Sequence, residues 1–459
     1  MTDEGLQASI DKMRRDDVGD AAVQAFADAY ERLRGGETGV LPEAEIEPVD
    51  ALPDAGDLAD ADAAEALDRA VVIKLNGGLG TSMGMSGPKS LVEVKDGLTF
   101  LDVIVRQVLG LRERTGARLP LVLMNSFSTR DASLQALERH PEIAADVPPD
   151  FLQNKVPKIG AQDMRPVEWP DDPALEWAPP GHGDLYAALV TSGMLEQLLD
   201  TGYRYAFVSN ADNLGAVLDP RILAWVAAEE IPFLMEVADR TEADRKGGHV
   251  ARRSGGGLVL REVAQTPDED LDAFQDISRH RFFNTNNLWV DLQALRDQLD
   301  RGDGALGLPM IVNRKTVDPS DPASPPVIQL ETAMGAAIDV FDGARALRVP
   351  RSRFAPVKTT NDLLTLRSDA YVLTDEALVR LAEGREAPPV VDLDADVYKL
   401  LPDFEERFAS GPPSLVEAER LTVAGDVAFG AGVVVRGAVT IEHDGDGRLR
   451  IEDGAVLEG

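Results

Sequence analysis

A glycine-rich segment that ends in a lysine is the part of the sequence best suited to binding phosphate. Residues 71–91 read VVIKLNGGLGTSMGMSGPKSL, an apolar run leading into Gly77 and Gly78. Glycines let backbone N–H groups approach a phosphate or a base edge closely. A proline separates the last glycine from Lys89, so the segment is not a P-loop, and the glycine spacing does not fit a dinucleotide-binding fingerprint. Residues 77–87 exceed the usual connection of about 2–6 residues, which favours a triphosphate-binding loop over a plain strand–helix connection.

Two further segments combine glycines or amides with a side chain that can contact a ligand. In APPGHGDLYAAL, His182 lies between two glycines, and Asp184 is placed to begin a helix. A lone histidine is commonly structural, but this setting makes a ligand contact at least as plausible. In FVSNADNLGA, Asp212 follows an apolar strand, with Asn210 shortly before it. One carboxylate among amides suits a Mg²⁺ ion held mostly by phosphate and water, with an Asx-turn as the alternative.

Three later segments supply more cations and amides. ADRKGGHV places Lys246 beside two glycines, and FFNTNNLWV offers three asparagines, Asn286 among them, ahead of an expected apolar strand. APVKTTNDLL places Lys358 at an expected helix start, where the cation and the helix N-terminus both favour a phosphate. Each segment is weak evidence alone. Together they predict a site for a polyanionic ligand.

The elements that must position these residues form an α/β pattern. From residue 69 onward, apolar runs rich in Val, Ile, Leu and Phe alternate with helical patterns, as in AVVIKLN, FLDVIVRQVLGLRERTG and LPLVLMNS. This alternation predicts an α/β domain with a largely parallel sheet. Ligands of such sheets lie beyond the carboxyl ends of the strands, which is where the polar residues described above fall.

The last 40 or so residues carry a different period. Two apolar tracks recur every six residues, formed by Leu421, Val427, Val433 and Val439 and by Val423, Phe429, Val435 and Ile441. A two-track repeat of six with interspersed glycines predicts a parallel β-helix rather than a short antiparallel meander. Residues 1–70 read as an acidic helical region and linker. We therefore divide the chain into residues 1–70, a catalytic domain at 71–385, and a C-terminal domain at 386–459 that ends in the β-helix.

Composition narrows the class of protein. The chain has 459 residues, with 46 Lys and Arg against 80 Asp and Glu, a net charge of −34. This acidity argues against nucleic acid and anionic membranes as partners. Having no cysteine excludes disulfides and thiolate chemistry. No basic start followed by an apolar run and no long apolar stretch are present, so we expect a soluble, cytoplasmic protein.

These segments, in this order, resemble the UTP–glucose-1-phosphate uridylyltransferase family, also called UDP-glucose pyrophosphorylases, of the eukaryotic type. The resemblance covers about residues 70–459 and rests on KLNGGLGTSMG…GPKSL, PLVLMNSF, PPGHGD, FVSNADNLGA, KGG, FNTNNLW, VIQLETAMGAAI, VPRSRFAPVKTTNDL and LTVAGDVAFG. It implies a Rossmann-like, GT-A-like nucleotidyltransferase domain followed by a left-handed parallel β-helix. It also implies the Mg²⁺-dependent reaction of UTP with glucose 1-phosphate to give UDP-glucose and pyrophosphate.

The resemblance also implies roles for single residues. The uridine and nearby phosphates would be held by Leu75, Asn76, Gly77 and Gly78. Lys89 would bind the triphosphate, and Gln153 and Gly181 would contact the uracil. The sugar phosphate would be contacted by His182, Asn210 and Asn286. Asp212 would ligate Mg²⁺, Lys246 would hold phosphate, and Lys358 would be the catalytic lysine.

Three alternatives stay open on the sequence alone. The first is the same chemistry on another sugar 1-phosphate, such as an N-acetylhexosamine 1-phosphate. The second is a catalytically silent protein that binds sugar nucleotides, although Lys89, Asp212 and Lys358 are all present. The third is a role of the β-helix in assembly, through which the chain would form a homo-oligomer.

Overall fold

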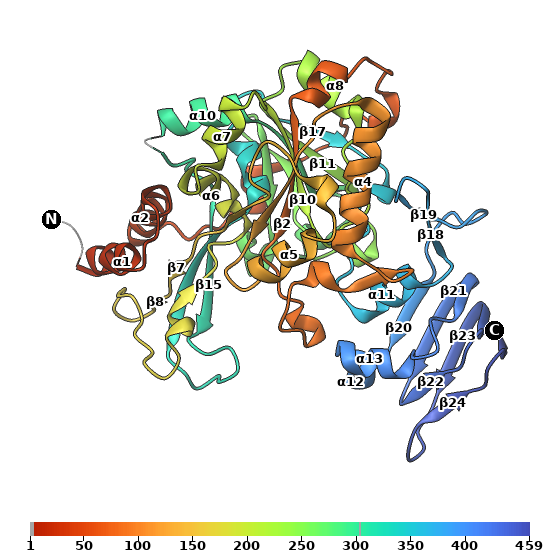
Figure 1. The fold of residues 1–459 in the computed structure, drawn as a ribbon. Helices are drawn as coiled ribbons and strands as arrows, with labels where there is room; N and C mark the ends of the chain where they lie inside the picture. Colours follow the sequence, from red (N-terminus) through yellow and green to blue (C-terminus); the bar gives the residue numbers. More distant parts are fainter. Residues whose placement is uncertain (1–3, 303) are drawn as a thin grey trace.

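A ten-stranded mixed sheet forms the centre of the molecule (Figure 1). The computed structural model describes residues 4–302 and 304–459. Four strands run parallel in the order β10-β2-β5-β6. They are β2 (Ala70–Asn76), β5 (Leu121–Asn125), β6 (Asp150–Leu152) and β10 (Tyr205–Asn210). Three of these strands coincide with apolar runs that the sequence indicated.

The other half of the sheet corrects the expectation of a largely parallel arrangement. The long strand β14 lies between β10 and β11 and runs antiparallel to both. The remaining members are β1 (Ile46–Pro48), β11 (Phe233–Asp239), β12 (His249–Arg253), β13 (Leu258–Arg261), β14 (Phe282–Asp291) and β17 (Arg345–Arg348). The β12–β13 hairpin turns the chain between β11 and β14, and strands joined by a short turn pair antiparallel. Strand direction therefore follows from connections that the apolar runs do not encode.

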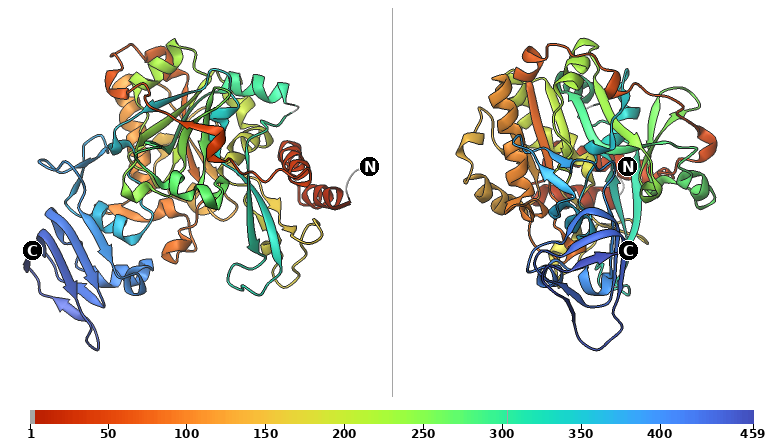
Figure 2. Two further views of the ribbon diagram at one scale, coloured as in Figure 1. Left: turned by 180° about the vertical axis from the view of Figure 1, so that it is seen from behind. Right: turned by 90° about the vertical axis from the view of Figure 1, so that its right-hand side faces the viewer.

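Helices cover both faces of this sheet (Figures 1 and 2). Alternate side chains of β2 point to opposite faces, so Val72 packs in one apolar cluster and Val71 and Ile73 in the other. Helices α4 and α8 contribute to the first cluster, and α6, α7 and α10 to the second. The helices are α3 (Ala64–Asp68), α4 (Phe100–Thr115), α5 (Arg130–Leu137), α6 (Leu185–Thr191), α7 (Met194–Asp200), α8 (Pro220–Ala228), α9 (Leu271–Gln275) and α10 (Leu292–Arg301).

The N-terminal helices α1 (Glu4–Arg15) and α2 (Asp20–Arg34) lie at one end of the molecule. Leu6, Met13, Phe26 and Tyr30 pack in a separate apolar cluster with side chains of β7, β8, β15 and β16. These strands are β7 (Val156–Pro157), β8 (Ile159–Gly160), β15 (Met310–Thr316) and β16 (Pro326–Thr332). The chain then returns to the central sheet, because β1 pairs with β12. The division into three domains stays a prediction.

The C-terminal strands lie at the opposite end of the molecule (Figure 2). Strands β20, β21, β23 and β25 form a parallel sheet, and β22 pairs with β24, also in parallel. The antiparallel meander considered as an alternative therefore does not occur. The bounds are β20 (Val390–Leu393), β21 (Ser414–Ala424), β22 (Val427–Phe429), β23 (Val434–Glu442), β24 (Leu449–Ile451) and β25 (Val456–Glu458).

One apolar cluster runs from the central domain into this C-terminal part. It joins side chains of α4 and α8 to Phe404, Phe408 and Phe429. The connecting elements are α11 (Thr360–Arg367), β18 (Tyr371–Leu373), β19 (Val379–Leu381), α12 (Ala395–Tyr398) and α13 (Leu401–Arg407). Short strands β3 (Glu93–Lys95), β4 (Leu98–Thr99) and β9 (Trp177–Ala178) complete the described chain. None of the described helices is both long and apolar enough to span a bilayer.

Candidate active site

A pocket of about 390 Å³ opens at the carboxyl ends of the parallel strands. The register of the sheet places Asn76 beside Asn125, and Leu75 beside Asn210, so these strand ends meet at one edge. The pocket brings together ten of the residues singled out in the sequence: Leu75, Asn76, Gly77, Gly78, Lys89, Gln153, Gly181, His182, Asn210 and Asp212. Ser90, Met124, Pro179 and Ala211 complete the lining.

The glycine-rich loop closes on itself beside the pocket. The backbone N–H of Lys89 donates to the carbonyl of Gly78 at 3.1 Å, which returns the lysine to the strand end from which the loop departs. A Cβ at Gly77 would lie 2.4 Å from Oε1 of Gln153, whereas a Cβ at Gly78 would meet no described atom within 4 Å. The absence of a side chain at Gly77 therefore lets Gln153 approach the end of β2. At Gly78 the space that a side chain would fill is empty in the described structure.

Asn76 has a structural task besides its place in the pocket wall. Its buried Nδ2 donates to Oδ1 of Asn125 at 2.7 Å and to Oγ of Ser133 at 2.8 Å. Both N–H groups of this amide are thus used inside the fold, where they tie β2 to β5 and to α5. The sequence placed Asn76 at the ligand without indicating this second role.

His182 is held in one tautomer by the backbone. Met334 donates its N–H to Nδ1 of His182 at 2.9 Å, so the neutral ring carries its proton on Nε2. Desolvation of the ring lowers the pKa of His182 to about 4, although the residue as a whole is exposed. The hydrogen bond acts in the same direction, because protonating Nδ1 would break it. At neutral pH the ring is an uncharged donor. Gly181 before it has φ +78°, and a Cβ there would lie 2.4 Å from the Thr332 carbonyl oxygen.

Asp184 departs from its expected role as the cap of α6. It occupies the cap position, but its side chain makes no capping bond. Its carboxylate instead accepts from the backbone N–H of Asn154 at 2.6 Å and from Nδ2 of Asn154 at 2.9 Å. This pair joins the segment that carries Gln153 to the segment that carries His182. Burial raises the pKa of Asp184 to about 6.

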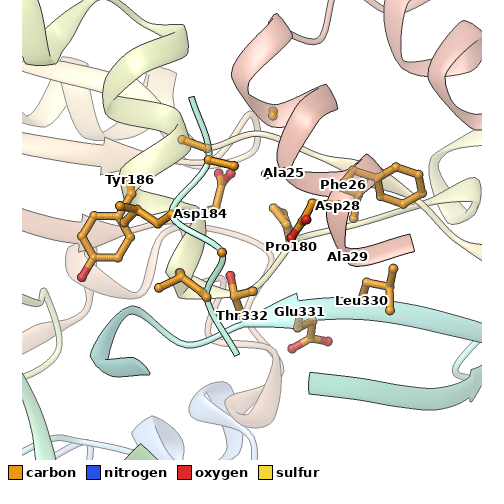
Figure 3. A pocket seen from close by; sticks show the side chains of 18 of the residues that line it. Ala25, Phe26, Asp28, Ala29, Pro180, Asp184, Tyr186, Leu330, Glu331 and Thr332 are labelled. Atoms are coloured by element: carbon orange, nitrogen blue, oxygen red, sulfur yellow. The ribbon is translucent and has the colours of Figure 1, made fainter. Parts of the chain in front are cut away.

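A second, mainly apolar cavity lies behind the His182 segment (Figure 3). Phe26 and Ala29 of α2 lie on one side, and Asp184 and Tyr186 lie on the other. Pro180, Leu330 and Thr332 lie between them or below. Asp184 is buried among these mainly apolar side chains, in keeping with its raised pKa.

Lys89 and Asp212 face each other across the pocket. Nζ of Lys89 donates to Oδ2 of Asp212 at 2.7 Å. The other carboxylate oxygen, Oδ1, is buried and has no hydrogen-bond partner in the described structure. A carboxylate with one oxygen unpartnered beside a cation can accept a metal ion, a phosphate-bound metal above all.

Three of the predicted residues, Lys246, Asn286 and Lys358, are outside the described lining of this pocket. Lys246 is exposed and precedes β12, and Lys358 is exposed and precedes α11. Asn286 lies inside β14 rather than before it, which corrects the expected strand start. It has φ +59° at an irregularity in the β11–β14 pairing, so the chain bulges out there.

Contacts between aromatic residues and glycines bring these three segments together. A Cβ at Gly247 would lie 3.9 Å from Phe283, and the Phe283 and Phe354 rings pack edge to face with centroids 4.8 Å apart. Nζ of Lys358 lies 5.9 Å from the centroid of the Phe354 ring. Asn284 donates its N–H to the Gly248 carbonyl at 2.9 Å, and its Nδ2 donates to Oδ1 of Asn286.

The second group of segments adjoins the pocket through Asp212. The backbone N–H of Val357 donates to the carbonyl of Asp212 at 3.2 Å. Lys358 is the next residue after this contact. A capping box between Thr359 and Asp362 begins α11 directly after it. The two groups of predicted residues are therefore adjacent parts of one surface.

Sequence reasoning missed the buried residues that support the site. Glu236 is fully buried in the apolar strand β11 and pairs with Arg353. A carboxylate within FLMEV was itself a signal, since a charge in a buried strand needs a partner. Its partner is more than a hundred residues away, and no spacing rule connects the two.

The chain is similar over most of its length to known proteins. The family model described as UTP--glucose-1-phosphate uridylyltransferase matches residues 23–436. A UTP--glucose-1-phosphate uridylyltransferase of Solanum tuberosum is 44% identical over 394 residues, which cover 85% of this chain and 80% of the relative. One of Hordeum vulgare is 44% identical over 402 residues, covering 87% and 83%.

Solved structures agree with this. A mutant UDP-glucose pyrophosphorylase of Leishmania major in complex with UDP-glucose has a TM-score of 0.93 and 48% identity, and covers 100% of this chain and 99% of that one. A UDP-glucose phosphorylase of Trypanosoma brucei has a TM-score of 0.90 and 46% identity, with coverage of 99% and 98%.

Proposed function

Because the chain belongs to the UTP–glucose-1-phosphate uridylyltransferase family, a family of nucleotidyltransferase enzymes, we propose that it converts UTP and glucose 1-phosphate into UDP-glucose and pyrophosphate. The observation that carries this proposal is the pocket at the strand ends, which gathers ten residues that the family resemblance assigns to the nucleotide, the sugar phosphate or Mg²⁺. The similar Leishmania major protein with UDP-glucose bound supports the same substrate pair.

The reaction needs positioning and charge stabilisation more than a strong base. A phosphate oxygen of glucose 1-phosphate attacks the α-phosphorus of UTP and forms a new P–O bond. The bond to the β-phosphate breaks, and its electron pair leaves with pyrophosphate. The attacking phosphate is already an anion, so no proton has to be removed first. The protein must align two anions and stabilise negative charge on the α-phosphate and the leaving group.

Three basic or donor side chains suit these tasks. We assign the triphosphate to Lys89 and the transferring phosphate to Lys358, since Lys358 follows the contact between Val357 and Asp212. When a triphosphate binds, Lys89 exchanges its contact with Asp212 for phosphate oxygens. His182 is a neutral donor through Nε2, suited to a sugar or phosphate oxygen without adding charge.

Asp212 is the residue we propose for Mg²⁺. Its buried, unpartnered Oδ1 fits an ion that is mostly held by phosphate oxygens and water. Among residues 4–302 and 304–459, no group of three or more acidic or histidine side chains suits a metal, so the phosphates would have to supply most of the ligands. The bound ion would neutralise charge on the phosphates.

We also propose that the central domain is of the Rossmann-like, GT-A-like type and that the C-terminal strands are coils of a left-handed β-helix. Support comes from the register of β21 with β23, in which Leu421 pairs with Val439 and Val423 with Ile441. Each pair is 18 residues apart, which equals three units of the six-residue repeat. A homo-oligomer formed through this part stays a proposal, tested by light scattering after size exclusion.

Pyrophosphate release by the purified protein tests the function. With UTP, Mg²⁺ and glucose 1-phosphate, we expect turnover, which Lys358→Ala lowers about 100-fold or more. Lys399→Ala removes an exposed lysine outside the site and is the matched control. N-acetylglucosamine 1-phosphate is offered in parallel. Turnover with that sugar alone would move the substrate assignment, and no turnover with either would leave a protein that only binds sugar nucleotides.

A further inference from the structure

A largely buried polar network connects β11, β14 and the residue directly after Asp212 with the segment that leads to Lys358. Its anchor is Glu236 of β11, which is 0% exposed. Arg353 binds it with two parallel hydrogen bonds, Nε to Oε2 at 2.7 Å and Nη2 to Oε1 at 2.6 Å. Two parallel bonds fix the orientation of the guanidinium group as well as its distance.

The carboxylate of Glu236 has further donors. Nδ2 of Asn287 lies 3.0 Å from Oε2, and Nε1 of Trp289 lies 2.9 Å from Oε1. Four hydrogen bonds thus hold one buried carboxylate. Such a fully satisfied network has one favoured arrangement, because any shift of a member leaves a buried polar group unpaired.

Asn213 connects this network to the backbone that precedes Lys358. Its Oδ1 accepts from the N–H of Ala355 at 3.0 Å and from the N–H of Gly215 at 3.2 Å. Its Nδ2 donates to the carbonyl of Arg353 at 3.1 Å and to Oδ1 of Asn287 at 3.3 Å. The Asn213 side chain therefore binds the backbone at the first and the last residue of the segment 353–355. Asn213 directly follows Asp212 in the chain.

The segment is also packed closely against the loop that carries Asp212. A Cβ at Gly215 would lie 2.4 Å from the Ser352 carbonyl oxygen. Beyond Ala355, the N–H of Val357 bonds the Asp212 carbonyl, and Lys358 follows. The path from Asp212 to Lys358 through Asn213 thus consists of buried or partly buried hydrogen bonds and a few residues of chain.

We propose that Asn213 is a positioning residue that sets Lys358 at its working place relative to Asp212, with Glu236 and Arg353 as its anchor. This inference rests on the proposed roles of Lys358 and Asp212. Asn213 does not line the described pocket, so it acts through the backbone it holds. A small displacement of a charge-stabilising group costs turnover far more than it costs substrate affinity.

Steady-state kinetics of Asn213→Ala test the proposal. We expect kcat to fall about 10- to 100-fold, with the KM for UTP changing by less than about threefold. Ser324→Ala is the control, since it removes a buried side chain whose hydrogen bonds, to the backbone of Asp318 and Asp321, lie outside this network and outside the described pocket lining. We expect its kcat to stay within about threefold of the unmodified protein. Denaturation curves show that each variant is folded, and Asn213→Ser replaces Asn213→Ala if the latter does not fold.

A double-mutant cycle with Lys358→Ala separates positioning from a general loss of structure. Radiolabelled glucose 1-phosphate allows slow turnover to be followed over hours. If Asn213 acts through Lys358, adding Asn213→Ala to Lys358→Ala lowers turnover by less than about threefold further. Losses that multiply, or unchanged kcat in Asn213→Ala, overturn the inference. Full activity of Lys358→Ala alone would instead overturn the proposed role of the lysine.

Discussion

The contact between Lys89 and Asp212 is the ion pair at the centre of the proposed polyanion site. The chain carries a net charge of −34, so a site for the proposed triphosphate depends on the few cations that line it. Lys89 is paired with a carboxylate whose other oxygen is unpartnered in the described structure. The pair holds the lysine in the pocket and leaves one carboxylate oxygen for the Mg²⁺ ion that we propose.

Asp212→Asn should lower kcat about 100-fold or more, because the neutral amide is a much weaker ligand for Mg²⁺. The concentration of Mg²⁺ needed for half-maximal turnover should rise. Initial rates over a Mg²⁺ titration measure both effects, with Asp396→Asn, an exposed aspartate of the C-terminal part, as the control. An unchanged Mg²⁺ requirement would assign the metal to other ligands.

The buried carboxyl group of Asp184 is a second single residue with a testable effect, a pH dependence of the free energy of unfolding. Its pKa is raised from 3.8 to about 6 by burial, so between these values the folded protein holds a proton that the unfolded chain releases. Its contribution is therefore full below pH 3.8 and is lost as pH rises through 6. By linkage the loss is on the order of 3 kcal/mol.

Asp184→Asn removes this titration. Denaturant unfolding from pH 4 to pH 7 should show the free energy of unfolding of the unmodified protein declining relative to that of the variant. Equal slopes for the two proteins over this range would show that Asp184 ionises normally. Because its carboxylate also joins the segments of Gln153 and His182, the variant should bind UTP more weakly.

At the scale of elements, the site depends on how closely loops approach strand ends. Residues 77–87 close through the bond between Lys89 and Gly78, and Gln153 fills the space beside Gly77. The β14 bulge similarly turns Asn286 out of a buried strand. In both places a glycine or an unusual backbone conformation occurs where a neighbouring side chain needs space or has to change direction.

Gly77→Ala should raise the KM for UTP about tenfold, because the added methyl group would displace Gln153 from the strand end. Gly87→Ala is the matched control, since a Cβ at that position meets no described atom within 4 Å. Initial rates over a range of UTP concentrations give both KM values. Equal values for the two variants would show that Gln153 does not need to approach the loop.

At the scale of the whole molecule, the C-terminal strands share an apolar core with the central domain. Phe429 stacks on Phe408 with centroids 5.0 Å apart, and both belong to the cluster that includes α4 and α8. Two regions that share one core are expected to unfold together.

Phe429→Ala should therefore destabilise the protein by about 3–5 kcal/mol and lower the unfolding midpoint of the central domain too. The four tryptophans, at positions 169, 177, 225 and 289, all precede the C-terminal strands, so their fluorescence reports on the rest of the chain. Urea unfolding followed by tryptophan fluorescence and by circular dichroism should give one shifted transition. A fluorescence transition that stays unchanged would make the C-terminal part an independent unit.

Local patterns were enough to predict much of the fold and to single out most residues that line the pocket. Strands β2, β5 and β10 and helix α4 coincide with apolar runs or helical periods that the sequence displays, because the preferences behind such patterns act within a few residues. The segments that line the pocket were recognisable because glycines, a lysine and asparagines gather directly after apolar runs, where ligands of α/β sheets bind.

The tertiary structure alone decided the rest. The direction of β14, the inward hydrogen bonds of Asn76, the carboxylate of Asp184 and the partner of Glu236 all depend on residues far away in the chain. Pairing of strands and satisfaction of buried polar groups are properties of neighbours in space. The sequence gives the type of each residue, but only packing determines which distant group a side chain contacts. That contact decides whether the side chain is left to bind a ligand or holds another residue in place.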